Sequence, residues 1–378
     1  MKVKVQNACT VIFRLINRYC GIFRNMSRAL RNLCERFLPD KSGARKRSRE
    51  IDAMLKRDRR FAELILLFGS DKSGKTTFLK QMRLVKGAEF NHEERLKFRE
   101  AIYNNIIRGM RVLVQERKKL GIPWQNSANE MHEMLIESFE RRMNFEPCAF
   151  QPYVSAIDSL WKDSGIQEAD RSRTNFELYE SVKYYFDNIH RIGQLYYLPN
   201  NQDILYTHKY RSKEEHYFVL RDSPFLVYLA ICRLRGPLSW TFPIMCPIFY
   251  IIGSSDYDQI SDEYNCLVQS LDMFESLYNK KMFLNNNIIL FFNKMDLLAE
   301  KVQTADIRKH FPEFQGDPHR LEDVQEFLIQ SFKKRTGNYS RLVFYHMITA
   351  VDTENFRDVF KTVEDIVMCR NLKGFPIL

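Results

Sequence analysis

The chain has 378 residues, of which 45% are hydrophobic and 28% are charged, and its net charge is +11. This composition excludes a disordered chain, a collagen-like repeat and a small disulfide-stapled domain, and the length predicts two or three folding units of roughly 150 residues each. Residues 1–50 hold 13 Lys or Arg residues against three acidic ones, a net charge of +10. The rest of the chain is therefore close to neutral, and we expect no nucleic-acid partner.

Cysteine usage and hydropathy narrow the class of protein further. The 8 cysteines are scattered and form no C-x-x-C pair, which predicts reduced thiols rather than disulfides or a zinc site. No apolar run reaches the roughly 18 residues needed to cross a bilayer. Arg14 and Arg18 interrupt the first apolar stretch, so the start does not resemble a secretory signal.

Residues 1–45 are predicted to form a basic amphipathic extension. Within residues 10–38, apolar side chains recur in steps of three and four, with arginines mostly between them. Such a helix can lie on an anionic membrane surface; packing on the body or a mitochondrial transit peptide are the alternatives. Three cysteines lie on or beside the basic face: Cys9, Cys20 and Cys34. Each could be palmitoylated or buried, whereas N-myristoylation is excluded because no Gly follows Met1.

The body of the chain begins with residues 64–68, a continuous apolar run of the kind that a buried parallel strand needs. Residues 86–198 predict helices, with long periodic segments at 93–119 and 176–192. From residue 217 onward, apolar runs alternate with helical stretches, which predicts βαβ units on a parallel sheet. The predicted strands are residues 218–220, 225–231, 247–252, 287–292 and 343–347.

A glycine-rich loop of the form G-x-x-x-x-G-K-T lies between the first strand and a predicted helix at residues 77–86. Its residues are Gly69, Ser70, Asp71, Lys72, Ser73, Gly74, Lys75 and Thr76. The amides of such a loop bind phosphate, Lys75 meets the β and γ phosphates, and Thr76 offers a hydroxyl to Mg²⁺. A chance match is the alternative, but the strand–loop–helix context favours a nucleotide site.

A second motif indicates which base is bound. Asn293, Lys294 and Asp296 form an N-K-x-D sequence directly after a predicted strand. The carboxylate of Asp296 can accept hydrogen bonds from the two N–H donors on the edge of guanine, which adenine lacks. The carboxyl ends of parallel strands are where α/β sheets bind ligands. The two motifs together predict a guanine nucleotide. The loop at residues 293–296 and the helical insertion at residues 86–198 argue against a P-loop ATPase or kinase of another family.

With these motifs, the sequence resembles the alpha subunits of heterotrimeric G proteins over about residues 46–378. Further matching stretches are residues 74–85, 198–207, 255–258, 288–297, 352–355 and 359–360. The resemblance implies an α/β, P-loop GTPase fold, a mostly parallel sheet with flanking helices, into which an all-helical domain is inserted. The GTPase domain would comprise residues 46–85 and 199–378, and the helical domain residues 86–198.

The resemblance also implies ligands and partners. GDP or GTP would bind with Mg²⁺, and the contacts would extend to Thr77, Ser181 and Leu205, while the N–H of Ala350 would face the guanine oxygen. The partners would be a beta-gamma dimer, a G protein-coupled receptor that contacts the C-terminal tail (residues 365–378), and the cytoplasmic face of the plasma membrane. Pro376 departs from the usual pattern of that tail.

Departures from the family cluster at the γ-phosphate. By resemblance, the family's catalytic arginine aligns with His208, and its magnesium-binding threonine aligns with Arg211 or Ser212. The family's D-V-G-G-Q sequence aligns with residues 229–233, so Arg233 replaces the glutamine. The same region contains three prolines that we expect to break the second-switch helix: Pro224, Pro237 and Pro243. We expect very slow or absent GTP hydrolysis unless Arg233 or His208 compensates. A nucleotide-bound scaffold that does not cycle is the alternative function.

Overall fold

The computed structural model describes residues 63–139, 145–171, 181–208, 215–220, 223–229, 246–261, 264–284, 286–336 and 342–373. Several predictions concern residues outside these ranges. These predictions concern the basic N-terminal helix and its three cysteines, and the end of the C-terminal tail. They also concern the switch residues Arg211, Ser212, Arg233, Pro237 and Pro243.

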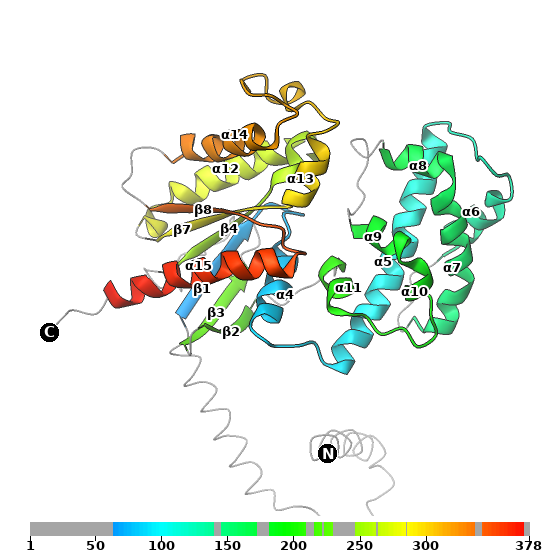
Figure 1. Ribbon diagram of the computed structural model, residues 1–378, viewed down its shortest axis with the longest axis horizontal. Helices are drawn as coiled ribbons and strands as arrows, with labels where there is room; N and C mark the ends of the chain where they lie inside the picture. The colour runs from blue at the N-terminus through cyan, green and yellow to red at the C-terminus, as the bar shows by residue number, and fades with distance from the viewer. Residues whose placement is uncertain are drawn as a thin grey trace, which may run out of the picture. The chain divides into compact units, whose positions relative to one another are not determined.

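Six strands of the described chain form a sheet in the order β2-β3-β1-β4-β7-β8 (Figure 1). The strands are β1 (Glu63–Gly69), β2 (Glu215–Leu220), β3 (Ser223–Leu229), β4 (Ile248–Gly253), β7 (Ile288–Asn293) and β8 (Val343–Met347). All neighbouring pairs are parallel except β2 and β3. The predicted strands and the mostly parallel sheet are confirmed.

The antiparallel pair at the edge of the sheet differs from the predicted βαβ pattern. Only residues 221 and 222 separate β2 from β3, and a parallel crossover needs a dozen residues or more. Pro224 lies on β3, opposite Val219 of the edge strand β2. The prediction that Pro224 breaks a helix was therefore wrong, because Pro224 is the second residue of a strand that spans Ser223–Leu229.

The strands alternate their side chains between two hydrophobic cores, as the period of two requires. Leu66, Tyr250 and Leu290 face the core that contains α12 (Cys266–Tyr278) and α14 (Leu321–Lys334). Ile65, Phe249 and Phe291 face α4 (Lys75–Val85) and α15 (Thr353–Lys373) on the other side (Figure 1). Because both faces are covered, the central strands consist almost entirely of apolar residues.

A separate hydrophobic core surrounds α5 (His92–Lys119). This helix begins with a capping box in which Asn91 and Glu94 bond to each other's backbone N–H. The other helices of this part are α6 (Asn129–Glu137), α7 (Pro147–Lys162), α8 (Ser164–Arg171), α9 (Ser181–Asp187) and α10 (Ile189–Ile192). The helix predicted at 93–119 is confirmed, whereas the described part of the one predicted at 176–192 is interrupted at Asn188.

Short elements complete the described chain. They are α11 (Asn201–Tyr206), α13 (Met295–Lys301), the hairpin of β5 (Ile260–Ser261) and β6 (Tyr264–Asn265), and the 3-10 turns η4 (Ser254–Asp258), η5 (Lys281–Phe283) and η6 (Ile307–Lys309). No helix of the described chain is long and apolar enough to span a bilayer.

Candidate functional site

The phosphate loop connects the end of β1 to the start of α4. Gly74 is the N-cap of α4, with a left-handed φ of 97° and no side-chain cap, so the first amides of the helix remain available to an anion. Gly69 has no room for a side chain, because a Cβ there would lie 2.4 Å from the carbonyl oxygen of Ile251. The two glycines therefore set the curl of the loop, as the motif predicts.

Polar groups of the loop are turned inward. The Lys75 ammonium donates to the carbonyl oxygens of Gly69 at 2.9 Å and Ser70 at 2.6 Å, so the cation lies within the loop. The hydroxyl of Ser73 is buried without a hydrogen-bond partner among the described residues. Asp71 and Lys72 are exposed, and Thr76 is half-buried in the first turn of α4. A bound phosphate would supply the acceptor that Ser73 lacks.

Asn293, the last residue of β7, joins the phosphate loop to the loop that contains Ala350. This second loop, residues 348–351, is called the base loop below. Its side-chain nitrogen donates to the carbonyl oxygen of Ser73 at 2.9 Å, and its side-chain oxygen accepts from the amide of Ala350 at 3.0 Å. A Cβ on Gly74 would lie 2.2 Å from that nitrogen. The Ala350 amide therefore already has an acceptor within the protein. The predicted contact of this amide with guanine stays a prediction.

Of the rest of the N-K-x-D motif, Lys294 pairs with a carboxylate and Asp296 lines a pocket. Lys294 has a left-handed φ of 65°, and its ammonium lies 3.0 Å from the carboxylate of Asp256. Asp296, in the first turn of α13, lines an open pocket of about 450 Å³. The other lining residues are Gln202, Tyr206, Thr349, Val351, Asp352, Thr353 and Glu354. The predicted base-reading carboxylate therefore borders a cavity next to the loop that contains Ala350.

Residues from α11 and the following segment lie beside the phosphate loop. The hydroxyl of Thr77 donates to the carbonyl oxygen of Leu205 at 3.4 Å, and Lys80 donates to the carbonyl oxygens of Ile204 and Thr207. The Leu205 side chain is buried, and its carbonyl oxygen contacts the first turn of α4. Ser181 begins α9, and its contact with the nucleotide stays a prediction.

The surroundings of His208 lower the pKa of its imidazole and so favour its neutral form. Burial lowers the pKa of its imidazole, and the positive charges of Lys80, Lys72 and Arg108 lower it further. Its carbonyl oxygen accepts a hydrogen bond from Asn105 at 2.9 Å. A side chain that favours its neutral form therefore occupies the position that the resemblance assigns to a catalytic arginine.

No group of three or more His, Cys, Asp or Glu residues in the described chain could hold a metal ion. Thr76 offers one hydroxyl, which suits Mg²⁺, because this ion takes few protein ligands and completes its shell with phosphate and water. The donors present therefore fit a magnesium ion that arrives with a nucleotide rather than a protein-only site.

Sequence reasoning missed Gln202 and Tyr206 in the wall of the pocket. The side-chain nitrogen of Gln202 donates to the carbonyl oxygen of Val351 at 3.1 Å, which ties α11 to the base loop. The available signal was their position on the segment that also holds Leu205 and His208, two residues for which the resemblance did imply a role.

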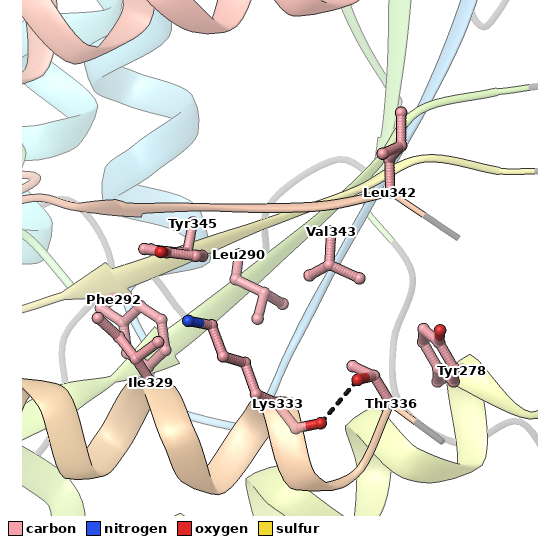
Figure 2. A pocket seen from close by; sticks show the side chains of 9 residues that line it. All are labelled: Tyr278, Leu290, Phe292, Ile329, Lys333, Thr336, Leu342, Val343 and Tyr345. Atoms are coloured by element: carbon pink, nitrogen blue, oxygen red, sulfur yellow. Dashed lines mark hydrogen bonds between the residues drawn. The ribbon is translucent and has the colours of Figure 1, made fainter. Parts of the chain in front are cut away.

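A second cavity, of about 270 Å³, contains none of the predicted residues (Figure 2). It lies between strands β7 and β8 and helix α14, and its walls are mainly apolar. The ammonium of Lys333 lies over the ring of Tyr345, 4.8 Å from its centre. This cavity therefore offers no phosphate loop or base-reading carboxylate.

Comparison with known proteins assigns the family. The family described as "G-protein alpha subunit" matches residues 45–367. The human guanine nucleotide-binding protein subunit alpha-12 is 49% identical, covering 88% of this chain and 91% of the relative. The rat alpha-12 subunit is 46% identical (94% and 99%), and the mouse alpha-13 subunit is 41% identical (87% and 91%). The chain therefore belongs to the family of guanine nucleotide-binding G-protein alpha subunits.

Proposed function

We propose that this alpha subunit holds GDP firmly, binds Mg²⁺·GTP less well, and hydrolyses GTP very slowly. The observation that carries this proposal is the hydrogen-bonded junction at Asn293, which joins the phosphate loop to the base loop beside the Asp296 pocket. These are the parts that a nucleoside diphosphate needs. By resemblance, in contrast, Leu229 replaces the aspartate of the magnesium shell, and His208 and Arg233 replace the catalytic arginine and glutamine.

The proposal assigns roles to the main predicted site residues. The amides of residues 69–74 and the ammonium of Lys75 bind the phosphates, Asp296 binds the edge of guanine, and Thr76 contributes a hydroxyl to Mg²⁺. The metal ion would neutralise phosphate charge when it is bound. Ser181, Leu205 and Ala350 remain candidate contacts to the nucleoside or phosphates.

Slow hydrolysis follows from two replaced side chains. In this family the catalytic arginine is known to raise the rate of GTP hydrolysis by a factor of about 10³–10⁵. A glutamine orients the attacking water. Burial and nearby cations lower the pKa of His208, which disfavours the charged imidazole that would have to replace the arginine. Arg233 carries a charge but lacks the amide that orients water.

We extend the proposal to partners and location on the strength of the family. The human and rat alpha-12 subunits and the mouse alpha-13 subunit are named as guanine nucleotide-binding proteins. The proposed partners are a beta-gamma dimer and a G protein-coupled receptor, which would contact the C-terminal tail. The basic residues of 1–50 would attract the anionic cytoplasmic face of the plasma membrane.

A binding titration tests the proposal. The full chain is titrated with fluorescently labelled GDP and with a labelled, non-hydrolysable GTP analogue, each with and without Mg²⁺. We expect tight GDP binding and at least about tenfold weaker binding of the analogue, a difference of 1.4 kcal/mol. Equal, magnesium-dependent affinity for the analogue would refute the weak γ-phosphate site.

The replacement of the family's arginine and glutamine by His208 and Arg233 also supports a second candidate, a nucleotide-bound scaffold that does not cycle. Single-turnover release of phosphate from bound GTP separates the two. The scaffold predicts no release above the rate of free GTP, whereas a measurable slow rate supports an impaired GTPase. A rate typical of the family would mean that Arg233 or His208 compensates, and it would overturn both candidates.

A further inference from the structure

The pocket beside Asp296 has an aromatic wall that comes from α11. Tyr206, the last residue of this helix, lines the pocket together with Gln202 and residues of the base loop. We infer that the ring of Tyr206 packs against the nucleoside of bound guanine nucleotide and slows its release. This inference rests on the proposed function, because it requires that guanine nucleotide occupies this pocket.

The ring of Tyr206 is held in place before any ligand arrives. It stacks on the ring of Tyr184, with the centroids 4.2 Å apart and the planes 15° from parallel. The hydroxyl of Tyr184 donates to the carboxylate of Asp203 at 2.8 Å, which anchors the stack to the buried start of α11. A ring that is already ordered loses little conformational freedom on binding, so its contacts contribute more fully to affinity.

The chemistry of the lining selects a nucleoside rather than a phosphate. The acidic residues among the lining residues are Asp296, Asp352 and Glu354, and the lining contains no Lys or Arg. Carboxylates repel phosphate but accept hydrogen bonds from the N–H groups of a purine. A flat aromatic ring stacks with any purine or packs on a ribose. The phosphates would instead extend toward Lys75 in the phosphate loop.

Tyr206 shares the lining of one pocket with Asp296, Thr349 and Val351. Burial raises the pKa of the Tyr206 hydroxyl, and the negative charge of Asp296 raises it further, as expected for neighbouring groups. Gln202, one turn earlier on α11, bonds to the carbonyl oxygen of Val351 in the base loop. The aromatic wall and the loop that contains Ala350 are therefore fastened to each other, and a nucleoside in the pocket would contact both.

The test is the dissociation rate of labelled GDP, chased with unlabelled GDP, from the full chain. Stacking on a base contributes about 1–3 kcal/mol, so Tyr206→Ala should release GDP at least about fivefold faster. Tyr206→Phe keeps the ring and should release GDP like the wild type. Tyr196→Ala is the matched control, because the Tyr196 side chain is 96% exposed, and its rate should be unchanged.

A spectroscopic variant keeps the inference testable if Tyr206→Ala fails to fold. Tyr206→Trp should show a change in tryptophan emission on adding GDP, measured relative to the same addition to the wild type. An unchanged emission difference, or a release rate for Tyr206→Ala equal to that of the wild type, would overturn the inference. A wild-type chain that binds no labelled GDP would instead refute the proposed function on which it rests.

Discussion

The buried side-chain amide of Asn293 joins the phosphate loop to the loop that contains Ala350. Its side chain donates to the phosphate loop at Ser73 and accepts from Ala350, so both halves of the amide are satisfied. Only 3% of the residue is exposed, and an unsatisfied polar group there would cost about 1–3 kcal/mol. The two loops are therefore positioned by one side chain that lies 220 residues from its phosphate-loop partner in the sequence.

Asp296 gives a prediction at the scale of a single residue. Replacing its carboxylate in Asp296→Asn removes a charged acceptor for two guanine N–H groups, each hydrogen bond contributing about 1.5–3 kcal/mol. We expect GDP affinity to fall by about 100-fold or more, measured by fluorescence titration. Asp358→Asn, a change at an exposed carboxylate on α15, should leave GDP affinity unaltered. Unchanged binding by Asp296→Asn would contradict the assignment of the pocket.

The sequence was informative about these residues to different degrees. Local motifs predicted Asn293 and Asp296, because their spacing and their place after a strand are visible in a short stretch. The contact between Gln202 and Val351 joins residues 149 positions apart, and no local pattern encodes such a pairing. The lowered pKa of His208 also depends on Lys80 and Arg108, which only the fold brings near.

At the scale of elements, one buried carboxylate holds α9, α10 and α11 together. Asp203 is fully buried and accepts hydrogen bonds from Tyr184, Tyr197 and Arg191. It also accepts from the backbone N–H of Asn200 in the capping box of α11. The α11 wall of the pocket beside Asp296 is thereby attached to the helices that precede it.

This cluster predicts a pH-dependent contribution to stability. Burial alone would raise the pKa of Asp203, but the hydrogen bonds from Arg191 and Tyr184 hold it below the usual 3.8. A lowered folded-state pKa stabilises the protein above 3.8, and this contribution is lost as the pH falls through the folded pKa. Asp203→Asn should therefore lower the free energy of unfolding by roughly 2–3 kcal/mol at neutral pH.

Urea denaturation checks this prediction. The difference between the wild type and Asp203→Asn should shrink on acidification below the usual carboxyl pKa, because protonation of Asp203 removes the same charge as the substitution. Asp272→Asn, at an exposed carboxylate that pairs with Arg335, should differ little from the wild type at any pH. A difference between the wild type and Asp203→Asn that is independent of pH would contradict the account.

Hydrophobic patterning predicted most elements of the fold, and connection length explains where it failed. Strands such as β4 and β7 are apolar throughout because both sheet faces are covered, which made them visible. The antiparallel β2 was not distinguished, since its direction depends on the two-residue connection to β3. Asn188, which separates α9 from α10, lies in a periodic stretch that gave no sign of an interruption.

At the scale of the whole molecule, the charge is concentrated at one end. Residues 1–50 hold almost all of the excess positive charge, and each basic residue near an anionic surface contributes about 1 kcal/mol. We predict that a chain lacking residues 1–40 binds vesicles of anionic lipid far less than the full chain does, in a sedimentation assay. Neutral vesicles are the control, and persistent binding by the shortened chain to anionic vesicles would show that the extension has another purpose.

The central claim, a GDP-holding alpha subunit with a weak γ-phosphate site, is tested most directly by comparing two ligands on one protein. Labelled GDP and the labelled non-hydrolysable GTP analogue are titrated into the full chain in the presence of Mg²⁺. The intact Asn293 junction and the replaced residues Arg233 and His208 predict tight binding of GDP and at least about tenfold weaker binding of the analogue. Equal affinity for both, or no binding of GDP, would contradict it.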